Sequence, residues 1–250
     1  MKSILLVSAR SDMGGGPRHL LELATYLKKN GFPVYIASPL DAPYGPKFSQ
    51  DFDGHFALPH RSLSLLAVFR LWLFARKNSV SIVHSHGKGG GVYGRLLALG
   101  GLSSIHTFHG LHPKGLISKL AEKLLSPLTQ KLVCVAESER TSALNLGLPQ
   151  QKLVLLANGF DFDQFQASSN EGHVLGTLSR LDPHKGNKEL LNLFLSLPET
   201  YTLKIAGGGE EREILQREIQ RLNLTNRVKR LGEVSSPSKF LEEISVYVSA

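Results

Sequence analysis

Residues 176–186 decide the fold, and they read Gly176-Thr-Leu-Ser-Arg180-Leu-Asp-Pro-His-Lys185-Gly186. The apolar run that ends in this stretch, residues 174–178, is typical of a buried strand. Residues 187–197 then place leucine and phenylalanine at helical spacing. The stretch therefore predicts a strand, a tight polar loop and a helix. In an open α/β sheet, ligands bind at the carboxyl ends of strands, where this loop would lie.

Arg180 and Lys185 are the candidate binding residues of this loop. Arginine offers a planar fork of donors and lysine a mobile point charge, and both are cations at neutral pH. The N-terminus of the following helix adds free N–H groups and a partial positive charge. Together these groups suit a diphosphate better than a single carboxylate. The alternative is a surface loop with two solvated cations, but Asp182-Pro183 and Lys185-Gly186 predict a rigid turn and favour a site.

The strand–loop–helix theme repeats on both sides of this stretch. Strands are predicted at residues 3–8, 34–38, 55–58, 81–84, 104–108, 132–136, 153–156, 174–178, 203–206, 227–231 and 245–249. Helices are predicted at residues 18–29, 63–77, 92–99, 113–126, 137–146, 187–197, 212–222 and 238–243. This alternation predicts an α/β fold with parallel sheets. The polar, aperiodic residues 162–172 predict a linker, which gives two domains at residues 1–168 and 169–250.

Two glycine runs precede predicted helices in the first domain. Gly14, Gly15 and Gly16 would let a ligand approach the backbone closely, although a plain tight turn explains them equally well. Their spacing is not the G-x-G-x-x-G fingerprint of dinucleotide-binding folds. The second run, within residues 87–91, is predicted to be a loop before the helix at 92–99.

Five histidines crowd one window of the first domain: His84, His86, His106, His109 and His112. A metal site is the first hypothesis for such a cluster. No carboxylate or cysteine joins them at ligand spacing, so we expect no metal. The favoured interpretation is that histidines at strand ends hydrogen-bond a ligand in a cleft. His109 is the strongest candidate, because it follows a predicted strand and precedes a glycine.

Composition and charge narrow the function classes. The net charge of +8 comes from the first part of the chain: residues 1–168 hold 18 Lys+Arg against 10 Asp+Glu, and residues 169–250 hold 11 against 11. Such a basic domain suits an anionic membrane surface or an anionic acceptor. No basic run with interleaved aromatics supports nucleic-acid binding. The sequence shows no secretory signal or membrane span, and its single cysteine cannot form an internal disulfide. We expect a cytoplasmic protein, with peripheral contact at the inner face of the membrane.

Seven stretches, taken in this order, resemble the group 1 family of retaining glycosyltransferases with the GT-B fold. They are residues 14–16 before a long helix, 82–86, 107–110, 158–161 with Phe165, 176–186, 205–210 and 231–232. Each is weak alone, but their order is specific, and the resemblance runs through all 250 residues.

The resemblance implies two Rossmann-like, doubly wound domains that face each other across a cleft. It implies transfer of a sugar from a nucleotide-diphosphate sugar to a glycan or lipid-linked acceptor, with retained anomeric configuration, as in the biosynthesis of cell-surface polysaccharide or lipopolysaccharide. Arg180 and Lys185 match the family's diphosphate-binding pair, and Gly15 and Gly16 its glycine loop at the cleft. His109 matches a histidine near the transferred sugar. The backbone near Val234 matches a segment that contacts the nucleobase. Because Arg180, Lys185 and a helix dipole can stabilise the charge on the leaving group, no metal or other cofactor is expected.

The sequence departs from the family pattern at its end. In the family, the strand that matches residues 246–249 leads to an E-x7-E motif and further βα units, and the chain ends before them. The second domain is therefore expected to be incomplete. This leaves a second hypothesis, a non-catalytic remnant that binds an acceptor, a membrane or a partner through the first domain. A third, a nucleotide-sugar epimerase of the same shape, is disfavoured by the Arg180/Lys185 loop and the Asn158-Gly159 turn.

Overall fold

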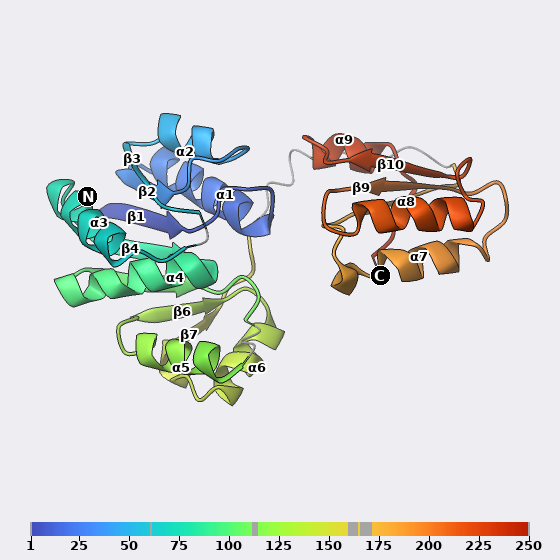
Figure 1. The fold of residues 1–250 in the computed structure, drawn as a ribbon. Coiled ribbons are helices and arrows are strands. Elements are labelled where there is room, and N and C mark those ends of the chain that lie inside the picture. Colours follow the sequence, from blue (N-terminus) through green and yellow to red (C-terminus); the bar gives the residue numbers. More distant parts are fainter. Residues whose placement is uncertain (1, 61, 112–114, 160–164, 166–171, 250) are drawn as a thin grey trace. The chain divides into compact units, whose positions relative to one another are not determined.

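A computed structural model of the chain describes residues 2–60, 62–111, 115–159, 165 and 172–249. The chain forms two compact units, Met1–Gly159 and Phe160–Ala250, and each is a parallel sheet with helices on its faces (Figure 1). The predicted α/β class with two doubly wound domains is confirmed. The predicted domain boundary between residues 168 and 169 lies outside the described residues.

Seven strands form the sheet of the first unit. They are β1 (Ser3–Ser8), β2 (Val34–Ser38), β3 (Gly54–Ala57), β4 (Val80–His86), β5 (Ser103–Thr107), β6 (Lys131–Cys134) and β7 (Leu153–Leu155). Their spatial order is β3-β2-β1-β4-β5-β6-β7, and each pairs in parallel with its neighbours. The chain runs outward from β1 in one direction and from β4 in the other. The carboxyl ends of β1 and β4 therefore flank a topological switch point, the place where open α/β sheets bind ligands.

Among the described residues, the helices that connect the strands of this unit are α1 (Gly15–Lys29), α2 (Gly45–Gln50), α3 (Leu65–Lys77), α4 (Gly87–Leu96), α5 (Gly115–Leu125) and α6 (Glu137–Asn145). β1 is apolar on both faces of the sheet because helices cover both. Alternate residues of β1 belong to two separate hydrophobic cores. Leu5 and Val7 pack beside α3 and α4, whereas Ile4 and Leu6 pack with Leu20 of α1. None of the described helices is long and apolar enough to cross a bilayer.

The prediction that residues 87–91 form a loop is wrong, because α4 begins at Gly87. Glycine is a poor helix former, so its run hid the helix. Here the glycines allow the helix to lie directly on the sheet. A Cβ at Gly90 would come 2.6 Å from the carbonyl oxygen of Val7, and one at Gly94 would come 2.5 Å from Cβ of Ser85. A second difference is α2, which forms within residues 39–53, a segment in which no helix is predicted.

Four strands form the sheet of the second unit: β8 (Val174–Leu178), β9 (Thr202–Ala206), β10 (Val228–Gly232) and β11 (Val246–Tyr247). Their order is β10-β9-β8-β11, again all parallel. The helices are α7 (Asn187–Phe194), α8 (Arg212–Arg221) and α9 (Pro237–Glu242). Leu191, Phe194, Leu203 and Leu215 are buried in its main core. The switch point of this sheet lies between β8 and β11, so the loop after β8 occupies it.

Candidate functional site

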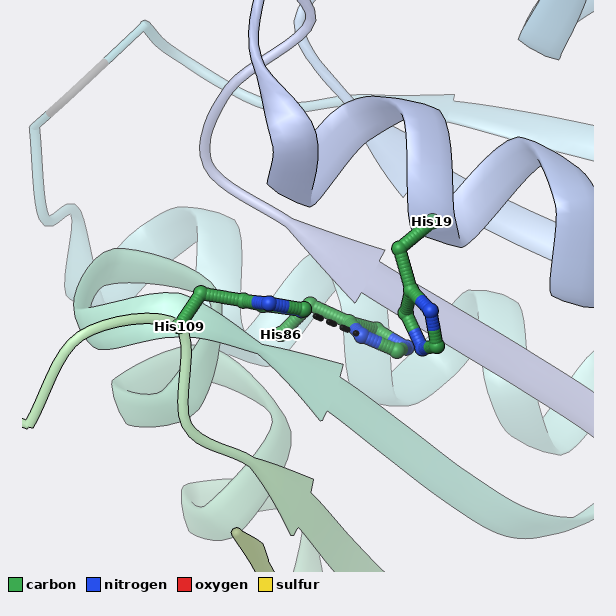
Figure 2. Close-up of side chains that lie close together, drawn as sticks. All are labelled: His19, His86 and His109. Atoms are coloured by element: carbon green, nitrogen blue, oxygen red, sulfur yellow. Dashed lines mark hydrogen bonds between the residues drawn. The ribbon is translucent and has the colours of Figure 1, made fainter. Parts of the chain in front are cut away.

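Three histidines from three elements converge at the switch point of the first sheet. His86 is the last residue of β4, His109 lies two residues beyond β5, and His19 is on α1, the helix that follows β1. The strands are in register there, with Ser8 of β1 beside His86 and His86 beside Thr107 of β5. Figure 2 shows the three side chains pointing toward one another. We call His19, His86 and His109 the histidine cluster.

The cluster is compact. Its ring centroids are 5.4 Å apart for His19 and His86, 5.2 Å for His19 and His109, and 5.6 Å for His86 and His109. Nδ1 of His86 and Nε2 of His109 are 3.3 Å apart and share a hydrogen bond. His86 is only 3% exposed, and its Nε2 has no hydrogen-bond partner among the described residues. The arrangement therefore leaves a buried polar atom that a ligand could satisfy.

Burial controls the charge of these rings. It lowers the pKa of His109 to about 4 and that of His86 well below 6.5, and the charge of neighbouring histidines lowers both further. Burial also lowers the pKa of His19, against the opposing effect of Glu22. The three imidazoles are accordingly neutral at neutral pH, and each can donate one hydrogen bond and accept another.

The other histidines of the window have different positions. His84 hydrogen-bonds through Nε2 to Oγ1 of Thr107 at 2.7 Å, and His106 through Nδ1 to Oγ of Ser85 at 3.0 Å. Both are held by neighbouring strands, as expected for structural histidines. His112 lies outside the described residues. No sequence motif selects His19, although its place three residues after the glycine run is an available signal.

Gly15 and Gly16, which were predicted to form a loop, are the first two residues of α1, and Gly16 lies against the histidine cluster. A Cβ built at Gly16 would lie 3.7 Å from Cδ2 and 3.8 Å from Cγ of His109, whereas one built at Gly15 meets nothing within 4 Å. The structure thus brings together Gly16 and His109, two residues that the sequence singled out separately. The space beside Gly15 stays open, and a side chain at Gly16 would come into contact with the imidazole ring.

A buried carboxylate that no sequence motif indicates anchors the loop that carries His109. Glu139 on α6 accepts a hydrogen bond from the backbone N–H of Gly110 at 2.5 Å and another from Val135 at 2.9 Å. Glu139 is 5% exposed. Because it binds the loops after β5 and β6 together, it fixes the residue next to His109.

The loop after β8 carries Arg180 and Lys185 at the switch point of the second sheet. Both side chains are exposed. Nη1 of Arg180 is 2.9 Å from Oδ2 of Asp182, and the backbone N–H of Lys185 donates to the carbonyl of Asp182 at 2.9 Å. A short 3-10 turn, Pro183–Lys185, follows, and Gly186 adopts a left-handed φ of 64° before α7 begins. The predicted turn is confirmed.

Glycines allow the loop after β8 to pack closely against the loop after β9. Leu181 donates its N–H to the carbonyl of Gly208 at 2.8 Å, and its own carbonyl accepts from Glu211 at 2.9 Å. A Cβ at Gly207 would overlap the carbonyl oxygen of Ser179, and one at Gly209 would come 2.6 Å from that of Leu181. The loops after β8 and β9 therefore form one fixed surface.

Val234 lies beyond β10, at the same edge of the sheet. It is half-buried and packs on Ala206, Phe240 and Ile244. Its neighbour Glu233 lies beside the glycine-containing loop after β9, since a Cβ built at Gly208 would come 2.6 Å from Oε1 of Glu233. Val234 thus borders the surface that carries Arg180, and the role of its backbone beside a nucleobase stays a prediction.

Two doubly wound sheets, each with candidate residues at its switch point, define an α/β protein of the GT-B class. Comparison with known families agrees: residues 13–164 match the model of Glycosyltransferase Family 4, and residues 160–250 match that of Glycosyl transferases group 1. The chain therefore belongs to the group 1 glycosyltransferases, with a family 4 N-terminal domain. The predicted family is confirmed.

Relatives and solved structures support this assignment. The chain is similar to the O-antigen biosynthesis glycosyltransferase WbnH of Escherichia coli, with 27% identity over 94% of this chain and 71% of that protein. It is 26% identical over 46% of this chain to an E. coli UDP-Gal:alpha-D-GlcNAc-diphosphoundecaprenol alpha-1,3-galactosyltransferase, of which it covers 33%. Anabaena Alr3699/HepE, solved with UDP and glucose, shares the fold with a TM-score of 0.88 and 18% identity, over 100% of this chain and 74% of that one.

Proposed function

We propose that this glycosyltransferase moves a hexose from a nucleotide-diphosphate sugar to a lipid-linked glycan, with retention, in the biosynthesis of a cell-surface polysaccharide such as O-antigen. The observation that carries the proposal is the conformationally fixed loop with Arg180 and Lys185 at the switch point of the second sheet. The names of the relatives support the donor and the acceptor, because they include an O-antigen enzyme and one that acts on a diphosphoundecaprenol-linked sugar.

The chemistry follows from charge. As the bond to the sugar breaks, negative charge grows on the nucleoside diphosphate that leaves. Arg180 and Lys185 would stabilise that charge, and removing one such donor typically lowers the rate by about 10²–10³. These two cations and the N-terminus of α7 supply the positive charge, so the proposed reaction needs no metal or other cofactor. Neutral His109 would hydrogen-bond the transferred sugar, with Gly16 leaving room beside it.

Two other hypotheses remain distinct from this one. The family models describe glycosyltransferases, so they favour transfer over epimerisation. The chain spans 71% of WbnH, and a remnant that only binds an acceptor or a partner would keep the first unit's fold without using a donor. Donor binding by the second unit separates this remnant from the enzyme.

A titration of the 250-residue chain with UDP-, GDP- and ADP-sugars tests the proposal. We expect one nucleotide to bind and to raise the melting temperature, since a ligand that binds only the folded state stabilises it. Arg180→Ala with Lys185→Ala should weaken binding by at least about tenfold, because each cation makes a charge-assisted contact with the diphosphate. Arg217→Ala with Lys229→Ala removes two exposed cations of the same unit and serves as the control. Equal donor affinity in both double variants would refute the assignment of the loop.

Contact with an anionic membrane is the second part of the proposal, and α5 supports it. The helix buries Glu122, whereas its large apolar side chains face solvent: Leu116 is 81% exposed, Ile117 87%, Leu120 52% and Leu124 66%. Exposed Lys119 and Lys123 lie among them. Apolar side chains flanked by lysines suit the interface of a bilayer that contains anionic lipid.

Vesicle binding tests this contact. The chain should bind vesicles that contain phosphatidylglycerol and should be partly released by salt, because the lysine contribution is screened while the apolar one is not. Leu116→Asp with Leu120→Asp should weaken binding by at least about tenfold, since each leucine buries apolar surface worth about 1.5–3 kcal/mol. Leu193→Asp, at a leucine of α7 that is 66% exposed, is the matched control. Equal losses in both variants would show that α5 is not the contact.

A further inference from the structure

The histidine cluster has the composition of a transition-metal site. Three neutral imidazoles and no carboxylate suit Zn²⁺, Cu²⁺, Ni²⁺ or Co²⁺ rather than Mg²⁺ or Ca²⁺, which prefer oxygen ligands. Three protein ligands also leave a fourth position open, as in zinc sites whose remaining ligand is water. One potential ligand nitrogen from each of His19, His86 and His109 lies within 4.8 Å of the other two.

Two of the three nitrogens already have the separation that a metal ion requires. Nδ1 of His86 and Nε2 of His109 are 3.3 Å apart. Two imidazole nitrogens that bind one tetrahedral zinc ion at ~2.1 Å are separated by about 3.4 Å. The third ring, His19, stands on the surface of α1 and is only half-buried, so its side chain can move the remaining distance. We infer that His19, His86 and His109 form a binding site for one zinc ion.

The surroundings of the cluster support metal binding over other roles. His84 and His106 each hydrogen-bond a hydroxyl group, that of Thr107 and that of Ser85 respectively. Neither belongs to the histidine cluster. The alternative is a plain hydrogen bond between His86 and His109, in which the nitrogen atoms stay close without a metal ion.

An occupied metal site would affect transfer. Under the proposed function, His109 contacts the donor sugar, and a zinc ion would take the lone pair that this contact uses. Zinc is therefore expected to act as an inhibitor of a reaction that needs no metal. This consequence rests on the proposed function, whereas binding of the metal itself does not.

The experiment is a metal titration of the full chain after removal of metals by a chelator. Zn²⁺ is titrated by calorimetry, and Co²⁺ by visible absorption, where tetrahedral coordination gives intense bands. We expect one ion per chain and a higher melting temperature with zinc. His19→Ala and His109→Ala should each weaken binding by at least about 10- to 100-fold, the loss that even an outer-shell partner causes.

The control is His173→Ala, which removes an exposed histidine of the second unit and should leave zinc affinity unchanged. The substitutions at His19 and His109 are chosen because neither ring is fully buried, and melting curves without metal verify that both variants fold. Absence of zinc binding, or equal affinity in the wild-type chain and both variants, would overturn the inference in favour of the plain hydrogen bond. Nucleotide binding through Arg180 and Lys185 is measured separately, so either proposal can fail while the other stands.

Discussion

Single residues around His109 set its position from two sides. Gly16 allows α1 to approach the ring, and Glu139 holds the loop that follows it. Both act through the backbone, and neither contributes a reacting atom. The precision of the site therefore depends on residues that chemistry alone would not select.

Glu139→Ala tests the anchor. It removes the acceptor of two part-buried hydrogen bonds, from the N–H groups of Gly110 and Val135, and a hydrogen bond to a charged group contributes about 1.5–3 kcal/mol. We expect a loss of that size in the free energy of unfolding, measured with urea, and a smaller loss for Glu139→Gln, which keeps one acceptor oxygen. Glu137→Ala, at an exposed carboxylate of the same helix, should change stability by less than about 0.5 kcal/mol. A stable Glu139→Ala variant would show that the anchor is dispensable.

Gly209 is the corresponding test in the second unit. Its φ of 154° and the Leu181 carbonyl at 2.6 Å from a built Cβ both oppose a side chain. Gly209→Ala should lower the free energy of unfolding by more than about 1 kcal/mol and weaken nucleotide binding, because the Arg180 loop must shift. Gly159→Ala, where a Cβ meets nothing within 4 Å, is the control. Unchanged nucleotide affinity in Gly209→Ala would show that Gly209 is not needed to position the Arg180 loop for binding.

At the scale of elements, a buried ion pair joins α4 to α5. Arg95 is fully buried, and its guanidinium contacts both carboxylate oxygens of Glu122, at 2.7 and 3.2 Å. Its Nε also donates to the carbonyl of Gly91 at 2.9 Å. Such a bidentate pair fixes the orientation of α5 more than it stabilises the fold.

Glu122→Ala should destabilise the first unit by about 3–5 kcal/mol, because it leaves a buried guanidinium without its partner. The double variant Arg95→Met/Glu122→Leu should recover most of this loss, since an apolar pair of similar volume is often neutral. Thermal and urea unfolding measure both. A double variant as unstable as Glu122→Ala would mean that the charges themselves are needed.

Periodicity predicted the elements well, and its failures have physical causes. Strand and helix order followed from apolar spacing, whereas the start of α4 did not, because tertiary contact with the sheet overrides the low helix propensity of glycine. The amphipathic pattern of residues 113–126 gave a helix, confirmed over Gly115–Leu125. It could not show that the polar side faces inward, since that depends on Arg95, 27 residues from Glu122 in the chain.

For the whole molecule, the candidate site is predictable where it follows strand ends. Arg180, Lys185 and His109 lie in loops that follow parallel strands, and Gly16 lies in the first turn of α1, the helix after β1. Topology gathers such residues at the carboxyl edge of each sheet. His19 and Glu139 lie within helices, where sequence alone gives no reason to select them. Only the three-dimensional arrangement places them beside His109.

Buried histidines should make the whole molecule sensitive to acid. Burial lowers the pKa of His106 well below 6.5, and it also lowers that of His55. Below pH 6.5 the unfolded chain binds protons that the folded chain excludes, so stability is full above that pH and falls as the pH drops. Each such histidine contributes a slope of up to about 1.4 kcal/mol per pH unit. Urea unfolding between pH 7.5 and 5, with a chelator present, measures it.

His106→Gln gives the matched comparison, since glutamine can keep a hydrogen bond to Ser85 and does not titrate. Its stability should depend less steeply on pH than that of the wild-type chain, whatever its absolute stability. Parallel curves for the two proteins would assign the acid sensitivity to other groups.

The buried Glu122 also affects self-association of the protein in solution. Because α5 cannot rotate without pulling Glu122 away from Arg95, its four exposed aliphatic side chains cannot turn inward when no bilayer is present. In buffer without lipid or detergent, these side chains should pack against those of a second molecule. Sedimentation should therefore show reversible self-association that increases with protein concentration. A mild detergent should reverse this self-association, and Leu116→Asp with Leu120→Asp should prevent it. The same substitutions should therefore give a monodisperse preparation of the protein.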